Sequence, residues 1–163
     1  MLSLRIKSMK LTKRKIPRLK DFDYSSSHVY FITSNTHEKK SYFIERDFNR
    51  EVIECLKEKR NVFEMKIFVY CLMPDHFHLL LQPSGKGASV SDFIGAFKGK
   101  VTALKRKRGI EGKLWQSRFH DHILRKNEDI TEVARYILNN PVRRGLVEVW
   151  EDYEFCCYLD EFD

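Results

Sequence analysis

The sequence predicts an α+β fold. We expect a ferredoxin-like split βαβ arrangement, in which an antiparallel sheet carries two helices on one face and an extra C-terminal helix brings in Tyr136. Apolar residues alternate in four segments, as in strands, and recur every three or four residues in three others, as in helices. The order is strand, helix, strand, strand, helix, strand, helix. The expected strands are 28–34, 62–72, 76–82 and 119–125, and the expected helices are 48–60, 89–108 and 128–140.

The two central strands are predicted to form a hairpin. Met73-Pro74-Asp75 between them has the composition of a tight turn. Alternation in the first strand predicts one face that carries Phe63, Met65, Ile67, Val69 and Cys71. In the second strand, Phe77, Leu79 and Leu81 point into a core, and His76 and His78 share the opposite face.

The helices have recognisable ends. Asp47, either Ser89 or Ser91, and Asn127 are predicted N-caps. Pro141 is expected to end the last helix, because the residue before a proline is disfavoured in helical conformation.

His76 and His78 are the first candidate metal ligands. His-x-His on a strand is a common pattern, and by itself it more often marks ordinary histidines than ligands. The last helix changes this view, because Tyr136 and Asn140 lie one turn apart on the same flank. Packed on the open face of the sheet, that helix would bring a phenol and an amide oxygen to the two imidazoles. Such a site suits phosphodiester transesterification, with a divalent cation beside a tyrosine nucleophile.

Charged residues are unevenly distributed along the chain of 163 residues, which has a formal net charge of +7. Residues 5–20 contain eight Lys or Arg and no acid, whereas residues 148–163 contain seven acids and no base. We expect a flexible basic arm at 1–20, a catalytic domain at 21–150 and an acidic C-terminal tail at 151–163. The positive balance favours nucleic acid as the partner, although many basic proteins bind none.

The four cysteines form no Cys-x-x-Cys pair, which argues against a zinc ribbon. No apolar run is long enough to span a membrane. We therefore expect a cytoplasmic protein that does not contact membranes.

Three blocks resemble a known family: Cys-Leu-Met-Pro-Asp-His-Phe-His-Leu-Leu-Leu (71–81), Leu-Trp-Gln-Ser-Arg-Phe-His-Asp (114–121) and Ala-Arg-Tyr-Ile-Leu-Asn-Asn-Pro-Val-Arg-Arg-Gly-Leu-Val (134–147). Together they resemble the small single-tyrosine HUH transposases. The lead-in at 18–24 points to the branch associated with repetitive extragenic palindromes, the REP-associated tyrosine transposases. The resemblance covers about 18–150.

The resemblance implies cleavage and transfer of single-stranded or hairpin DNA with Mg²⁺ or Mn²⁺ as cofactor. It implies His76, His78 and Asn140 as metal ligands, with Asn140 standing where the family often has the longer Gln. Tyr136 corresponds to the nucleophile that stays linked to the DNA 5′ end. Some relatives form homodimers that exchange the tyrosine helix and others act alone, so both arrangements stay open. The expected DNA-binding residues are Lys13, Arg14, Lys15, Arg18, Lys98, Lys100, Lys105, Arg106, Arg118, Arg143 and Arg144.

Alternatives remain at this stage. His120 and His122 repeat the His-x-His pattern and rank second as ligands. Trp115 is expected to stabilise the fold. A non-catalytic, domesticated protein that binds hairpin DNA is the main functional alternative. A metal-dependent hydrolase of small phosphoesters would need a base to activate water, and no such group stands out.

Overall fold

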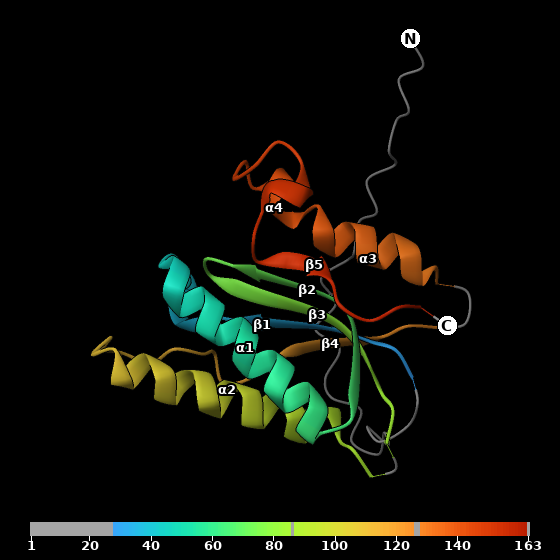
Figure 1. Ribbon diagram of the computed structural model, residues 1–163, viewed down its shortest axis with the longest axis horizontal. Coiled ribbons are helices and arrows are strands. Elements are labelled where there is room, and N and C mark those ends of the chain that lie inside the picture. Colours follow the sequence, from blue (N-terminus) through green and yellow to red (C-terminus); the bar gives the residue numbers. More distant parts are fainter. Residues whose placement is uncertain (1–27, 86, 126–127, 163) are drawn as a thin grey trace.

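The computed structural model describes residues 28–85, 87–125 and 128–162. The strands are β1 (Tyr30–Asn35), β2 (Met65–Met73), β3 (His76–Pro83), β4 (His120–Ile123) and β5 (Cys156–Tyr158), and the helices are α1 (Arg46–Val62), α2 (Val90–Lys107), α3 (Ile130–Leu138) and α4 (Asn140–Arg143), with 3₁₀ turns η1 (His37–Lys39) and η2 (Trp150–Asp152). The strands form one antiparallel sheet in the order β4-β1-β3-β2-β5. Helices α1 and α2 cover one face and α3 covers the other (Figure 1). The predicted α+β fold is confirmed.

Some predicted features lie outside the described residues. These are the basic arm at 1–20 with Lys13, Arg14, Lys15 and Arg18, the lead-in at 21–27 and the cap Asn127. Among the described helices, none combines the length and the apolar character that a membrane span requires.

Strand β3 lies at the centre of the sheet and pairs with both β1 and β2. Its side chains alternate as predicted. Phe77, Leu79 and Leu81 belong to the core beneath α1 and α2. His76 and His78 therefore occupy the other face, the one that α3 covers.

Strand β2 departs from the prediction at a β-bulge between Ile67 and Val69. A bulge places two residues opposite one, so every later side chain changes face. Ile67 packs under α1 and α2 as expected, but Val69 and Cys71 join the core under α3. Tyr70 and Leu72 take the helix-pair face instead. The expectation that Val69 and Cys71 share a face with Ile67 is wrong, because an unbroken apolar run does not reveal an inserted residue.

The helix starts differ in how well they were predicted. Asp47 lies in the first turn of α1 and is not its cap. Ser89 is the N-cap of α2, and its hydroxyl accepts a hydrogen bond from the Asp92 amide at 3.3 Å. Asp129 is the N-cap of α3, where its carboxylate accepts from the Thr131 amide at 2.8 Å.

The C-terminal end of α3 is a break rather than a stop. The helix ends at Leu138, and after Asn139 the chain continues as the short helix α4 with Pro141 in its first turn. Val133 and Ile137 pack α3 onto the sheet. The break sets the direction of α4, which carries Asn140 back toward β3.

The acidic segment 151–163 contributes β5, which the sequence did not predict. Cys156 stands opposite Cys71 across the β2–β5 pair and is buried. A strand of three residues is too short to give an alternating pattern.

Candidate active site

The two histidines of β3 form the centre of the candidate site. Their ring centroids lie 4.6 Å apart, with the planes tilted by 75°. His76 is 9% exposed and His78 is 8% exposed. A buried imidazole needs a partner for its polar atoms, so the groups around each ring decide what it can do.

His76 is held by a carboxylate that is itself held by an arginine. Its Nδ1 lies 2.6 Å from Oδ1 of Asp75. The Arg144 guanidinium donates to both oxygens of Asp75, at 3.0 Å and 2.9 Å. Although burial acts in the opposite direction, hydrogen bonds from His76 and Arg144 hold the pKa of Asp75 below its usual value. Asp75 is therefore a carboxylate, and the Nδ1 of His76 carries the proton between them.

With the proton on Nδ1, the Nε2 of His76 offers a lone pair. The side-chain nitrogen of Asn140 lies 2.9 Å from it, which fits an amide N–H donating to that lone pair. Burial lowers the pKa of His76, and the neighbouring Asp75 only partly offsets this. His76 is thus neutral near pH 7, with its free nitrogen facing α4.

His78 lies beside Thr33 of β1. The Thr33 hydroxyl is 2.9 Å from His78 Nδ1, and the two residues are paired across the sheet. Burial lowers the pKa of His78 well below its ordinary value, and the positive charge of Arg143 lowers it further. Both histidines of the pair are therefore in the neutral form that binds metal ions.

The Phe31 ring connects Tyr136 to this site, because it contacts both Tyr136 and His78. The Phe31 ring lies 5.4 Å from the His78 ring and 6.1 Å from the Tyr136 ring, centroid to centroid. The Arg143 guanidinium stands 4.0 Å from the centre of the Tyr136 ring and donates to the Tyr136 carbonyl at 2.7 Å. In this cation–π geometry the guanidinium is attracted to the face of the ring, so Arg143 and Tyr136 hold each other in place.

The side chains at this position fit a divalent cation. His76 and His78 are neutral and each has its Nδ1 engaged, which is the usual arrangement around metal-bound imidazoles. Asn140 would supply an oxygen, because a half-turn of its amide exchanges nitrogen and oxygen. Across the described ranges, no cluster of three His, Cys, Asp or Glu side chains forms an alternative metal site. Two imidazoles and an amide oxygen are the protein ligands available.

His120 and His122, the second-ranked ligand pair, lie on β4 at the edge of the sheet. His120 stands opposite Thr33. The Nε2 of His122 is 2.7 Å from a carboxylate oxygen of Glu128, which precedes α3. His122 thus fastens the entry to α3.

The predicted DNA-binding cations are spread over several places. Arg143 and Arg144 lie at the site, on Tyr136 and Asp75. Lys98 and Arg106 line a groove beside α2. Lys59 and, more weakly, Lys100 lower the pKa of Glu58, so Lys100 lies near α1. Arg118 is exposed just before β4.

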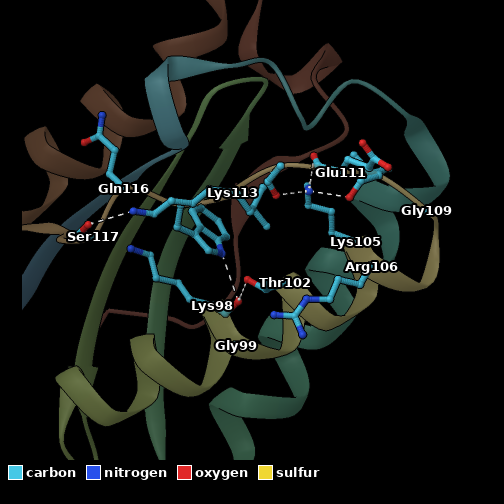
Figure 2. Close-up of a pocket in the computed structure, with 14 residues that line it drawn as sticks. Lys98, Gly99, Thr102, Lys105, Arg106, Gly109, Glu111, Lys113, Gln116 and Ser117 are labelled. Carbon is cyan, nitrogen blue, oxygen red and sulfur yellow. Dashed lines mark hydrogen bonds between the residues drawn. The ribbon is translucent and has the colours of Figure 1, made fainter.

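Lys105 does not match the prediction that it contacts DNA. It is 2% exposed. Its ammonium donates to the carbonyls of Ile110, Glu111 and Gly112 at 2.7 Å, 2.6 Å and 2.7 Å, as Figure 2 shows. All three N–H donors are used, so Lys105 holds the loop that follows α2.

The prediction from sequence missed the supports of the site. It places Asp75 only in the turn, although a carboxylate next to a histidine is a recognisable signal of a paired imidazole. Thr33 and Phe31 carry no signal, because their roles depend on the β1–β3 register.

Known proteins resemble this chain in sequence and in fold. The family model described as "Transposase IS200 like" matches residues 23–140. A Haemophilus influenzae protein with the provisional name REP-associated tyrosine transposase is 27% identical over 147 residues, which cover 83% of this chain and 82% of that protein. The REP-associated tyrosine transposase of Escherichia coli K12 is 26% identical over 137 residues, which cover 83% of this chain and 79% of that protein.

A solved structure of a REP-associated tyrosine transposase bound to a REP hairpin shares the fold. It matches with a TM-score of 0.69 at 21% identity, over 83% of this chain and 79% of that one.

Proposed function

Because the chain belongs to the IS200-like transposase family, with REP-associated tyrosine transposases among its relatives, we propose that it cuts and rejoins single-stranded or hairpin DNA through Tyr136. The observation that carries the proposal is the position of Tyr136 against Phe31, which in turn lies against His78. This brings a candidate nucleophile and a candidate metal site to one face of the sheet. We assign the activity to residues 21–150.

In the reaction, the Tyr136 hydroxyl oxygen forms a bond to phosphorus. The bond between phosphorus and the 3′ oxygen of the leaving strand breaks, and the proton of the phenol ends on that oxygen as a 3′-OH. The DNA 5′ end stays attached as a phosphotyrosine, and the reverse reaction rejoins a strand. One phosphoester bond replaces another, so the step consumes neither water nor ATP.

His76, His78 and Asn140 would hold Mg²⁺ or Mn²⁺. When bound, such a cation polarises a phosphate oxygen and neutralises developing charge. Asp75 keeps the proton of His76 on Nδ1, and Arg144 keeps Asp75 charged. Arg143 lies over the Tyr136 ring and donates to its backbone carbonyl, so it holds the tyrosine in position.

The DNA partner is supported by charge and by a relative. The chain carries a formal net charge of +7. The solved neighbour is described as bound to a REP hairpin. We propose the same class of ligand for this chain, with the basic arm at 1–20, Arg118 and the cations beside α2 as further contacts.

The test is to incubate the full chain with a labelled hairpin oligonucleotide and Mn²⁺, followed by a denaturing gel. The wild type should give a protein–DNA conjugate. Tyr136→Phe should abolish the conjugate while binding stays within a few-fold, because only the hydroxyl is lost. Tyr158→Phe is the matched control, since Tyr158 lies on β5 and is 43% exposed.

A conjugate that persists in Tyr136→Phe would place the nucleophile elsewhere. Binding by the wild type without any conjugate would favour the non-catalytic DNA-binding protein.

A further inference from the structure

A groove of about 910 Å³ lies between the second half of α2 and the loop that leads to β4 (Figure 2). Two glycines turn this loop back along the helix. Gly109 has a φ of +69° and Gly112 a φ of +86°, a region that residues with a Cβ rarely occupy. The loop includes Trp115 and Gln116, whose motif the proposed chemistry does not use.

The floor of the groove contains a buried positive charge. The three carbonyls that bind the Lys105 ammonium satisfy its hydrogen bonds but carry no net charge. In the described part of the chain, no carboxylate forms an ion pair with it. Its charge therefore adds to the positive potential of the groove, and the nearby Glu111 carboxylate offsets part of it.

Lys98 adds a second incompletely neutralised charge. Its ammonium lies 5.3 Å from the centre of the Trp115 ring and 5.9 Å from that of Phe119. Among the described residues, it has no acidic partner within ion-pair distance. Burial lowers the pKa of Lys98 to about 8, as expected for an ammonium whose counter-ion is missing.

The rim is also mainly basic. Arg106 and Lys113 are exposed on it, and the Lys113 ammonium donates to the Ser117 hydroxyl at 3.2 Å. The lining contains four cations (Lys98, Lys105, Arg106 and Lys113) and one carboxylate, that of Glu111. Figure 2 shows the side chains of Lys98 and Lys113 extending toward the side of the groove where Ser117 and Gln116 lie.

The groove ends close to the candidate active site. The backbone N–H of Gln116 donates a hydrogen bond to the backbone carbonyl of Asn35 at 3.0 Å. Asn35 is paired with His76 across β1 and β3. Two strand spacings, about 10 Å, separate the backbone of Gln116 from that of His76. Because the groove lies on the α2 face of the sheet and the His76 side chain on the α3 face, a strand that occupies both sites would pass around this end of β1.

We infer that this groove binds the phosphate backbone of the single-stranded DNA that flanks the scissile phosphate. The inference rests on the proposed function, because that function supplies the strand. Lys98 and Lys113 contact the phosphates, and Arg106 extends the path along α2. Trp115 is 7% exposed and donates its indole N–H to the Lys98 carbonyl, so it holds the groove wall.

The first test is binding of a fluorescent single-stranded oligonucleotide, without metal, across a salt series. Replacing Lys98 and Lys113 with Gln should weaken binding about tenfold at 0.1 M salt and reduce the salt slope by about 1.4, that is about 0.7 for each phosphate that the variant no longer neutralises. Lys57→Gln is the control. It removes an exposed lysine of α1, which pairs with Glu54 at 2.9 Å, and should leave the slope unchanged. An unchanged slope in the Lys98→Gln, Lys113→Gln protein would overturn the inference.

The second test locates the bound segment. Oligonucleotides are shortened step by step on the 5′ or the 3′ side of the cleavage position. If one flank occupies the groove, shortening it and replacing Lys98 and Lys113 remove the same interactions, so the two effects on affinity do not add. Additive effects on both sides would contradict the assignment.

Conjugate formation separates this inference from the proposed function. If the wild type forms the conjugate but replacing Lys98 and Lys113 leaves the salt slope unchanged, the inference about the groove is wrong and the proposed function stands. If the replacements reduce the salt slope but the wild type forms no conjugate, the groove binds DNA and the proposed DNA-cleaving chemistry is wrong.

Discussion

The two faces of β3 differ in polar content, because the face under α3 buries His76 and His78 beside the apolar Leu80. Phe77 and Leu81 pack against α1 and α2 in an apolar core, whereas His76 and His78 lie beneath the C-terminal helices with a polar partner on each Nδ1. Buried polar groups are tolerated when they are hydrogen-bonded, so the second face can hold chemistry without losing the fold. From this comparison we expect stability and the proposed activity to depend on different faces of the same strand.

The helices that cover the two faces of the sheet differ in length. Helices α1 and α2 have 17 and 18 residues, and α3 has 9. A short cover leaves room for α4 to bring Asn140 and Arg144 to the histidine end of β3.

The largest expected effect separates the two faces directly. Phe97 is 1% exposed and packs against Phe77, with ring centroids 5.3 Å apart. Phe97→Ala should lower the free energy of unfolding by about 3–5 kcal/mol, because it leaves a cavity. The protein that remains folded should still form the DNA conjugate. His78→Ala should show the reverse, with conjugate at background and a smaller loss of stability.

Urea unfolding and the conjugate gel measure the two quantities on the same samples. Equal destabilisation by His78→Ala and Phe97→Ala would break the comparison.

A smaller effect is expected from Asp75→Asn. Asparagine has the shape of aspartate but not its charge, so it holds the His76 proton on Nδ1 less firmly. Partners of metal-bound histidines typically contribute 10- to 100-fold, and we expect a loss of about that size in conjugate formation. The Mn²⁺ concentration for half-maximal activity should rise. DNA binding without metal should stay constant, and a parallel loss of binding would argue against a positioning role.

The smallest effect is a pH dependence of stability. Burial lowers the pKa of both His76 and His78 below 6.5 in the folded protein. Well above pH 6.5 both histidines are neutral in the folded and in the unfolded protein, so they add no pH dependence to the free energy of unfolding. As pH falls through 6.5, these histidines bind protons in the unfolded chain but stay neutral in the folded chain, so the free energy of unfolding falls. Urea unfolding between pH 7.5 and 5 should show this decline, and replacing both histidines with Asn should flatten it. Parallel curves would assign the decline to other groups.

Local patterns predicted much of the fold. The alternation of β3 correctly placed Phe77, Leu79 and Leu81 in the core. The spacing of apolar residues likewise predicted a helix over 128–140, and α3 packs Val133 and Ile137 against the sheet. Both signals belong to one element and need no knowledge of its neighbours.

Features that depend on contacts between elements were not predictable. The bulge of β2 inverts Val69 and Cys71 within a run that is apolar throughout. Lys105 looks like any lysine of a basic cluster, and only the return of the loop gives its ammonium three carbonyls. The contact between Asn140 and His76 joins residues 64 positions apart.

The break after α3 also bears on assembly. Tyr136, Asn140 and Arg144 follow one another along a single stretch that contains the break. If two copies were to trade this stretch, the phenol, the amide and the arginine would move as one unit. Each exchanged site would then combine the histidines and Asp75 of one copy with all three groups of the other.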